Sequence, residues 1–116
     1  MLPRAAKLLE DIRDAASYIL EITEGKTEDD YAQNRMLRQT VERNFEIIGE
    51  AVRRLDHHDP ATASRISQVA RIIAFRNALI HGYDVIDHAL VWQVVERSLP
   101  MLLNEVEALL AERQDV

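Results

Sequence analysis

Apolar residues recur at three- and four-residue steps along most of this chain, a pattern typical of helices that bury one face. Four segments show it, at about residues 3–24, 27–55, 65–80 and from 87 onward. The 116 residues include only three glycines and three prolines, which favours helices over a turn-rich β fold. We therefore predict one all-α domain over residues 1–116, an antiparallel up-and-down bundle of four to five helices.

Helix-ending and helix-starting residues separate these segments. Gly25 is a suitable stop for the first helix. Thr27 can cap the second, with Asp29 and Asp30 in the first turn, where the helix dipole favours negative charge. The second pattern is so long that we expect a kink or a separate first turn. Pro100 lies inside the last pattern and should bend that helix, because proline lacks a backbone N–H.

Two residues do not suit the helix positions that they occupy. Gly49 lies in a helix interior, where glycine costs about 1 kcal/mol relative to alanine. A close helix crossing would explain it, and a merely tolerated glycine is the alternative. Arg76 lies in the apolar face of the third helix, and a guanidinium cannot lose its proton on burial. Arg76 must therefore meet an internal carboxylate, a polar cleft or an anionic ligand.

The charge of the chain is unevenly distributed. The formal net charge is −6, which argues mildly against a nucleic-acid binder. Residues 60–83, however, contain no aspartate or glutamate and carry three arginines and a histidine. The third helix therefore lies in a locally positive part of an acidic chain.

Cysteine content and hydropathy exclude several classes of protein. With no cysteine, the chain has neither disulfides nor a cysteine-ligated zinc site, which fits a cytoplasmic protein. The charged N-terminal segment does not resemble a signal peptide, and no apolar run approaches the roughly 18 residues of a membrane span. His57 and His58 are adjacent and lack a third metal ligand at a suitable spacing. We expect them to be solvated, and we expect neither a metal nor a cofactor.

The sequence RNALIHGY, which begins at Arg76, carries the candidate chemistry. Asn77 and His81 are four residues apart and share one flank of the helix, which continues through Ala70 and Ala74. Arg76 lies on the neighbouring stripe, so the three polar side chains can border one groove. A histidine can move protons and an arginine can hold a phosphate, which together suit metal-free phosphodiester cleavage. The alternative role for His81 is a helix cap.

RNALIHGY also resembles the R-x4-H-x-Y signature of the HepT-like branch of HEPN domains. The resemblance extends to FEIIGEAVRRL and IIAFRNALIHGYDV, and to VWQVVERSLPMLL near the C-terminus. It implies a HEPN-like helical bundle. It also implies an endoribonuclease toxin of a type VII-like toxin–antitoxin pair, with a cognate minimal nucleotidyltransferase as the antitoxin and RNA as the substrate.

The resemblance further implies roles for individual residues. Arg76 and His81 match the catalytic pair, and Asn77 matches a supporting residue that contacts the RNA phosphate. Tyr83 matches the tyrosine that the nucleotidyltransferase modifies by AMPylation, which silences the toxin. The family implies a homodimer in which the two R-x4-H motifs face a shared cleft.

Two other functions are compatible with the same residues. In one, the chain is a non-catalytic helical module that binds a nucleotide or a nucleotidyltransferase, which the acidic net charge slightly favours. In the other, it is a structural dimer in which Arg76 only forms an internal ion pair. The intact Arg76–His81 pair favours the enzyme.

Overall fold

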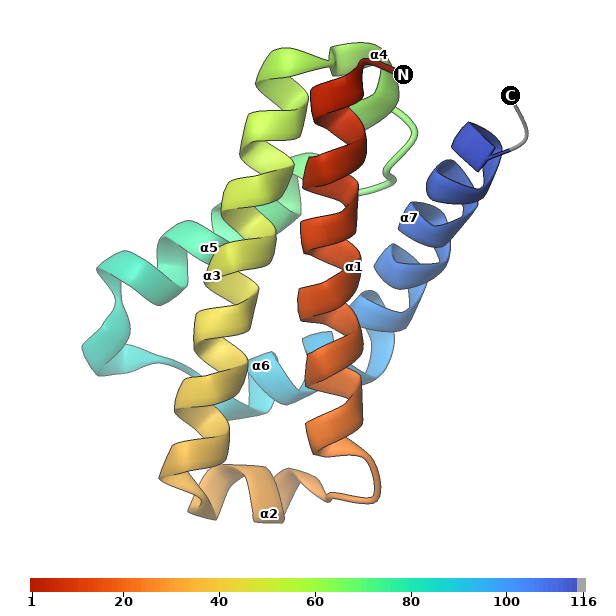
Figure 1. The fold of residues 1–116 in the computed structure, drawn as a ribbon. Helices are drawn as coiled ribbons and strands as arrows, with labels where there is room; N and C mark the ends of the chain where they lie inside the picture. The colour runs from red at the N-terminus through yellow and green to blue at the C-terminus, as the bar shows by residue number, and fades with distance from the viewer. Residues whose placement is uncertain (115–116) are drawn as a thin grey trace.

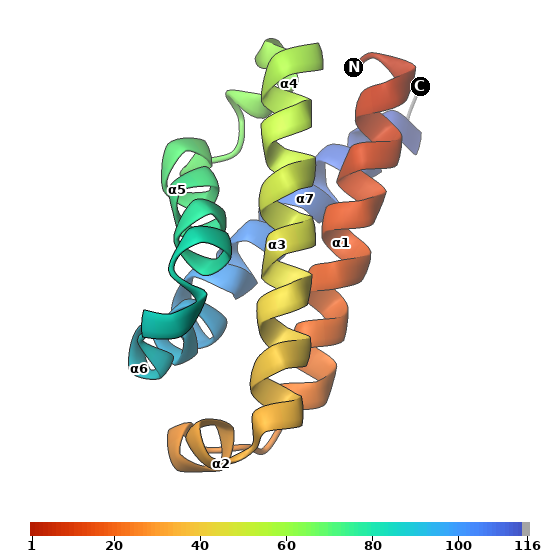
Figure 2. The same cartoon turned by 90° about the vertical axis from the view of Figure 1, so that its left-hand side faces the viewer.

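Two long helices, α1 (Pro3–Thr23) and α3 (Arg35–His58), lie side by side and antiparallel in the computed structural model (Figure 1). α5 (Val69–His81) packs against the other side of α3, and α7 (Leu99–Gln114) packs against α1 (Figures 1 and 2). The structure describes residues 1–114, so the last two positions of the domain predicted over 1–116 lie outside the described residues. The prediction of an all-α bundle is confirmed.

Short helical elements connect the long ones. They are α2 (Glu28–Gln33), α4 (Pro60–Ala63), the 3-10 turn η1 (Tyr83–Val85), α6 (His88–Gln93) and the π-helical turn η2 (Val94–Ser98).

The core lies mainly between α1, α3 and α7. Burial of their apolar faces is the main favourable contribution to folding. The largest fully buried aliphatic side chains are Leu9, Ile12, Ile19, Val41, Ile48, Val52, Leu55, Val91, Leu99 and Val106. No helix among residues 1–114 combines the length and the apolar character that crossing a membrane requires.

The second predicted helix is divided in two, with the separate first turn that its length suggested. Gly25 adopts a positive φ of 74° after α1, and Thr27 caps α2. The cap is reciprocal, because the Asp30 N–H donates to Thr27 Oγ1 at 3.1 Å and the Thr27 N–H donates to Asp30 Oδ2 at 2.9 Å. Asn34 then caps α3 by accepting from the Leu37 N–H at 3.0 Å. The chain therefore turns a corner between α2 and α3.

The third helix begins later than predicted, at Val69 instead of Arg65. Contacts with α7 hold the preceding residues in turns. The Ser67 N–H donates to Glu105 Oε2 at 3.1 Å, and Arg65 Nη1 donates to Glu112 Oε2 at 2.6 Å. These long-range partners compete with helical hydrogen bonds, and they cannot be identified from the local sequence pattern.

The connector between the second and third predicted helices is also more helical than expected. α3 continues past Leu55 to His58, and α4 follows directly. Asp59 separates the two helices, because its carboxylate caps α4 by accepting from the Thr62 N–H at 3.2 Å.

The bend predicted at Pro100 is present as a π-helical turn. In η2 the Leu99 N–H donates to the Val94 carbonyl, five residues back. The wider turn accommodates Pro100, which has no backbone N–H to donate within the helix. α6 and α7 consequently point in different directions, and α6 lies in the lower part of the bundle, above α2 (Figure 1).

Candidate active site

α5 approaches α3 closely at Gly49. A Cβ built on Gly49 would lie 2.2 Å from Arg76 Cβ and 2.6 Å from Arg76 Cγ, so no larger residue fits without a shift. Phe45 and Phe75 pack edge to face beside this contact, with ring centroids 5.1 Å apart. The close helix crossing that the sequence suggested for Gly49 is confirmed, and the residue that crosses it is Arg76.

Arg76 meets an internal carboxylate, one of the three surroundings that its burial required. Its Nη2 lies 3.3 Å from Glu50 Oε2, and the two side chains are each 25% exposed. Its Nη1 donates to Asn77 Oδ1 at 2.9 Å. Its Nε is buried and has no acceptor among the described residues. Glu50 and Asn77 thus hold the guanidinium on two sides, and its Nε–H donates to no acceptor among the described residues.

Glu50 is shared by three arginines. Besides Arg76, it accepts from Arg53 Nη2 at 2.8 Å and from Arg54 Nε at 3.0 Å. The hydrogen bonds from Arg53 have the largest effect and, with Arg54 and the charge of Arg76, lower the pKa of Glu50 to about 2. Glu50 is therefore a permanent anion at neutral pH. Sequence reasoning required such a partner for Arg76 without identifying it, although the position beside Gly49 was a usable signal.

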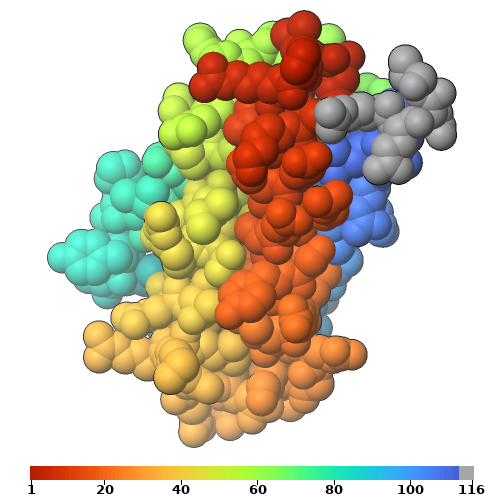
Figure 3. Space-filling view, viewed as in Figure 1, coloured from red at the N-terminus to blue at the C-terminus, as the bar shows by residue number. Residues whose placement is uncertain are grey.

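His81 and Tyr83 are accessible at the far end of α5. His81 is the last residue of the helix and is exposed, and Gly82 is its C-cap. Tyr83 is 78% exposed in η1. In the space-filling view, this end of α5 and the turn after it project from the body of the molecule (Figure 3). Both side chains are therefore within reach of other molecules.

The structure brings Arg76 and Asn77 together but does not add His81 to them. Five residues along a helix turn a side chain by roughly 140°, so Arg76 faces α3 while His81 faces elsewhere. Within residues 1–114, no hydrogen bond or ion pair links His81 or Tyr83 to Arg76. The expectation that Arg76, Asn77 and His81 of one protomer border one groove is therefore met only in part: Arg76 bonds to Asn77, and Asn77 and His81 share the exposed flank of α5, but the Arg76 side chain turns toward α3.

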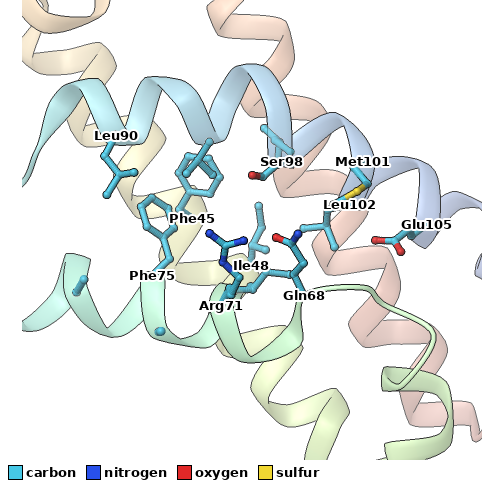
Figure 4. Close-up of a pocket in the computed structure, with 15 residues that line it drawn as sticks. Phe45, Ile48, Gln68, Arg71, Phe75, Leu90, Ser98, Met101, Leu102 and Glu105 are labelled. Atoms are coloured by element: carbon cyan, nitrogen blue, oxygen red, sulfur yellow. The ribbon is translucent and has the colours of Figure 1, made fainter.

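A groove of about 370 Å³ lies on the other side of α5, between it and the segment from α6 to α7 (Figure 4). Phe45 and Ile48 of α3 form its floor, and Leu90 and Met101 are on the opposite wall. The side chain of Arg71 extends into it from α5 (Figure 4). Leu90 and Met101 are 49% and 40% exposed, so the groove leaves apolar surface in contact with water.

The flank of small residues beside this groove is exposed along α5. It consists of Ala70, Ala74, Asn77, Ala78 and His81. Elsewhere, His57 and His58 are exposed at the end of α3. In the described part of the chain, no three His, Asp or Glu side chains converge as metal ligands would.

Comparison with known proteins gives the same family as the motif. The family model described as "Ribonuclease HepT-like" matches residues 12–109. These residues include α3, α5 and all the candidate positions from Gly49 to Tyr83. No solved structure matches the chain at a significant level.

Curated relatives agree. The chain is 33% identical over 99 residues to "Putative RNase MJ1380" of Methanocaldococcus jannaschii, which covers 85% of this chain and 90% of that protein. It is 31% identical over 103 residues to "Probable ribonuclease HepT" of Thermococcus cleftensis, and the match covers 87% of this chain and 91% of that protein. A longer protein of Methanocaldococcus jannaschii, "Gamma-glutamylcyclotransferase and putative RNase MJ0434", is 33% identical over 104 residues, 90% of this chain and 46% of that protein. The chain therefore belongs to the HepT-like ribonuclease family.

Proposed function

We propose that this chain is a cytoplasmic, metal-independent endoribonuclease toxin in which Arg76 and His81 are the catalytic residues. The observation that carries this proposal is the combination of a fixed cation and a free histidine on one helix. Arg76 is held by Glu50 and Asn77, while His81 is exposed at the end of α5. A phosphodiester needs both a positive group for its phosphate and a group that moves a proton.

The reaction needs only the 2′-hydroxyl of the RNA as nucleophile. His81 takes the proton of this hydroxyl, and the 2′-oxygen forms a bond to phosphorus. The bond from phosphorus to the 5′-oxygen breaks, and that oxygen takes a proton from a general acid. The products are a 2′,3′-cyclic phosphate and a 5′-hydroxyl. Arg76 binds the phosphate oxygens and offsets the negative charge of the transition state, and Asn77 supports that contact.

The site is completed by a second copy of the chain. Arg76 and His81 of one protomer point in different directions, so a homodimer with the two motifs facing a shared cleft brings each arginine to the other's histidine. The exposed small-residue flank of α5 supports this arrangement, because small residues allow two helices to approach closely. A second protonated His81 would then be the general acid.

AMPylation of Tyr83 by a cognate minimal nucleotidyltransferase would silence the enzyme. The tyrosine oxygen would bond to the α-phosphorus of ATP, and pyrophosphate would leave with the broken bond. The 78% exposure of Tyr83 supports this role, since the hydroxyl is open to another enzyme. An AMP group two residues from His81 would add negative charge where RNA phosphate must bind.

Cleavage of a mixed RNA pool by purified protein tests the catalytic proposal. We expect wild-type cleavage to persist with a chelator present, and His81→Ala and Arg76→Ala to reduce it by about 100-fold or more. His57→Ala is the matched control, because it removes another exposed histidine and should leave cleavage unchanged. A wild type that binds a nucleotide or nucleotidyltransferase but never cleaves RNA would instead support the non-catalytic module, which the net charge of −6 favours.

The dimer and the modification need separate tests. Ala74→Glu places a charge on the exposed flank of α5 and should convert a dimer to a monomer in light scattering, with Ala32→Glu on α2 as the matched control. Co-expression with a neighbouring nucleotidyltransferase should add mass in steps of AMP. A mass gain that persists in Tyr83→Phe would disprove Tyr83 as the target.

A further inference from the structure

Two adjacent residues of α3, Gly49 and Glu50, act on the same residue of α5. Gly49 lets the backbone of Arg76 lie directly against α3, since even a methyl group would be 2.2 Å from Arg76 Cβ. Glu50 then reaches the other end of the side chain, with its carboxylate 3.3 Å from Arg76 Nη2. The base and the tip of Arg76 are therefore both set by α3.

The tip of Arg76 has little freedom to rotate. Glu50 contacts Nη2, while the Asn77 amide oxygen accepts from Nη1 at 2.9 Å. These two contacts approach different nitrogens of a planar guanidinium, which fixes its orientation as well as its location. Because the side chains of Arg76 and Glu50 are each only 25% exposed, water screens their attraction less than that of a surface pair.

Glu50 does not cancel the positive charge that a phosphate would need. One carboxylate is shared among Arg53, Arg54 and Arg76, so the four side chains together remain positive. The groove of about 240 Å³ beside Arg76 is lined by three arginines, Arg43, Arg54 and Arg76, and by three carboxylates, Asp11, Glu46 and Glu50. The positive charge that a phosphate would meet therefore comes from the cluster around Glu50, in which three arginines share one carboxylate.

We propose that Glu50 is a positioning residue of the ribonuclease site, which acts by holding the Arg76 guanidinium in the orientation that binds the phosphate in the transition state. This inference rests on the proposed function, because it assumes that Arg76 contacts the phosphate. Glu50 itself does not touch RNA in this scheme. Its removal should therefore impair the chemical step more than the binding of substrate.

Steady-state cleavage of one RNA oligonucleotide by three variants tests the proposal. Glu50→Gln keeps the shape and removes the charge, and we expect kcat to fall by about 10- to 100-fold with KM changed by less than about threefold. Glu50→Asp keeps the charge and should recover part of kcat. Glu46→Gln is the matched control, because Glu46 is 24% exposed, lines the same groove and pairs with Arg43. Equal losses in Glu46→Gln and Glu50→Gln would overturn the proposal.

A double-variant cycle asks whether Glu50 acts through Arg76. In an Arg76→Lys background the orientation of a guanidinium no longer matters, so adding Glu50→Gln should reduce kcat by less than about twofold. If Glu50→Gln costs the same factor with arginine or lysine at position 76, Glu50 acts by another route and the proposal fails. Thermal unfolding of each variant identifies any that have lost the fold, in which case Glu50→Asp carries the comparison.

Side-chain NMR provides a readout that does not depend on activity. The Nε–H signal of Arg76, assigned by its loss in Arg76→Lys, should report restricted motion in the wild type and in Glu46→Gln. It should report faster motion in Glu50→Gln. Wild-type cleavage with unchanged Arg76 motion and kcat in Glu50→Gln would overturn the positioning role alone. A wild type that never cleaves RNA would overturn the proposed function and this role together.

Discussion

The two sides of α3 have very different neighbours. Against α1, the packing is dense, and the facing residues Leu9, Ile12, Ala16 and Ile19 of α1 are completely buried. α3 and α5 also pack closely, but the residues of α5 are less buried. Within α5, all of which is described, Leu79 is buried and the other residues are partly or fully exposed. We infer that α1 and α3 contribute most of the buried core, while α5 packs on α3 with one side and keeps its exposed side for other molecules.

The largest effect should come from the packed side. Leu9→Ala removes a fully buried side chain between α1 and its neighbours, and we expect a loss of about 2–5 kcal/mol in the free energy of unfolding. Urea unfolding followed by circular dichroism measures it. A loss below about 1 kcal/mol would mean that this side of α3 is not the stabilising one.

The next effect should come from the close approach of α5 to α3 at Gly49. Gly49→Ala places a methyl group 2.2 Å from Arg76 Cβ, so α5 must move away from α3. Overpacking of this kind costs about 1–3 kcal/mol, offset in part by the better helix propensity of alanine. The same unfolding experiment measures it, and we expect RNA cleavage to fall as well because Arg76 moves with α5. Stabilisation by Gly49→Ala would contradict the tight crossing.

The outcome at Gly49 also shows how far sequence reasoning reaches in this molecule. Local patterns were sufficient for the helices, for the Thr27 cap and for the bend at Pro100, because these depend on periodicity and on near neighbours. Gly49 and Arg76 each looked out of place on a helix, and the structure shows that one accounts for the other. That they meet depends on how α3 and α5 cross, which no local pattern contains.

Long-range polar partners account for most of what sequence reasoning missed. The start of α5 was placed too early because Arg65 and Ser67 bond to glutamates of α7 some 40 residues away, with separations of 47 and 38. Glu50 went unnamed for the same reason, since several glutamates could have met Arg76. We propose that Arg76 of one protomer pairs with His81 of the other, so the structure of a single chain cannot test this part of the site.

A smaller effect on the free energy of unfolding should appear at the α3–α5 contact when the pH is lowered. The pKa of Glu50 is lowered from 4.5 to about 2 in the folded chain, with the hydrogen bonds from Arg53 as the largest cause. The pKa of Glu50 in the folded chain is below its pKa in the unfolded chain. Glu50 therefore makes its full contribution to stability when the pH is above 4.5, and this contribution is lost as the pH falls from 4.5 to about 2. We expect wild type and Glu50→Gln to differ most in unfolding free energy near neutral pH and to converge at low pH.

The matched variant for this pH experiment is Arg53→Gln. It removes the largest cause of the lowered pKa of Glu50, so its own stability should depend less on pH than that of the wild type. A difference between wild type and Glu50→Gln that stays constant down to about pH 2 would mean that Glu50 is not a paired anion in the folded chain.

The smallest effect on the fold should come from the exposed leucine that faces α5 across the groove. Leu90 is 49% exposed where Leu9 is fully buried, so Leu90→Ala should change the free energy of unfolding of the isolated chain by less than about 1 kcal/mol. If the groove and the flank of α5 are covered by a second copy, the same variant should raise the dimer dissociation constant several-fold in sedimentation analysis. A loss as large as that of Leu9→Ala would place Leu90 in the core instead. An unchanged dissociation constant would mean that the partner does not cover this groove. Leu9→Ala and Leu90→Ala together therefore distinguish residues that stabilise the fold of one chain from residues that stabilise the dimer.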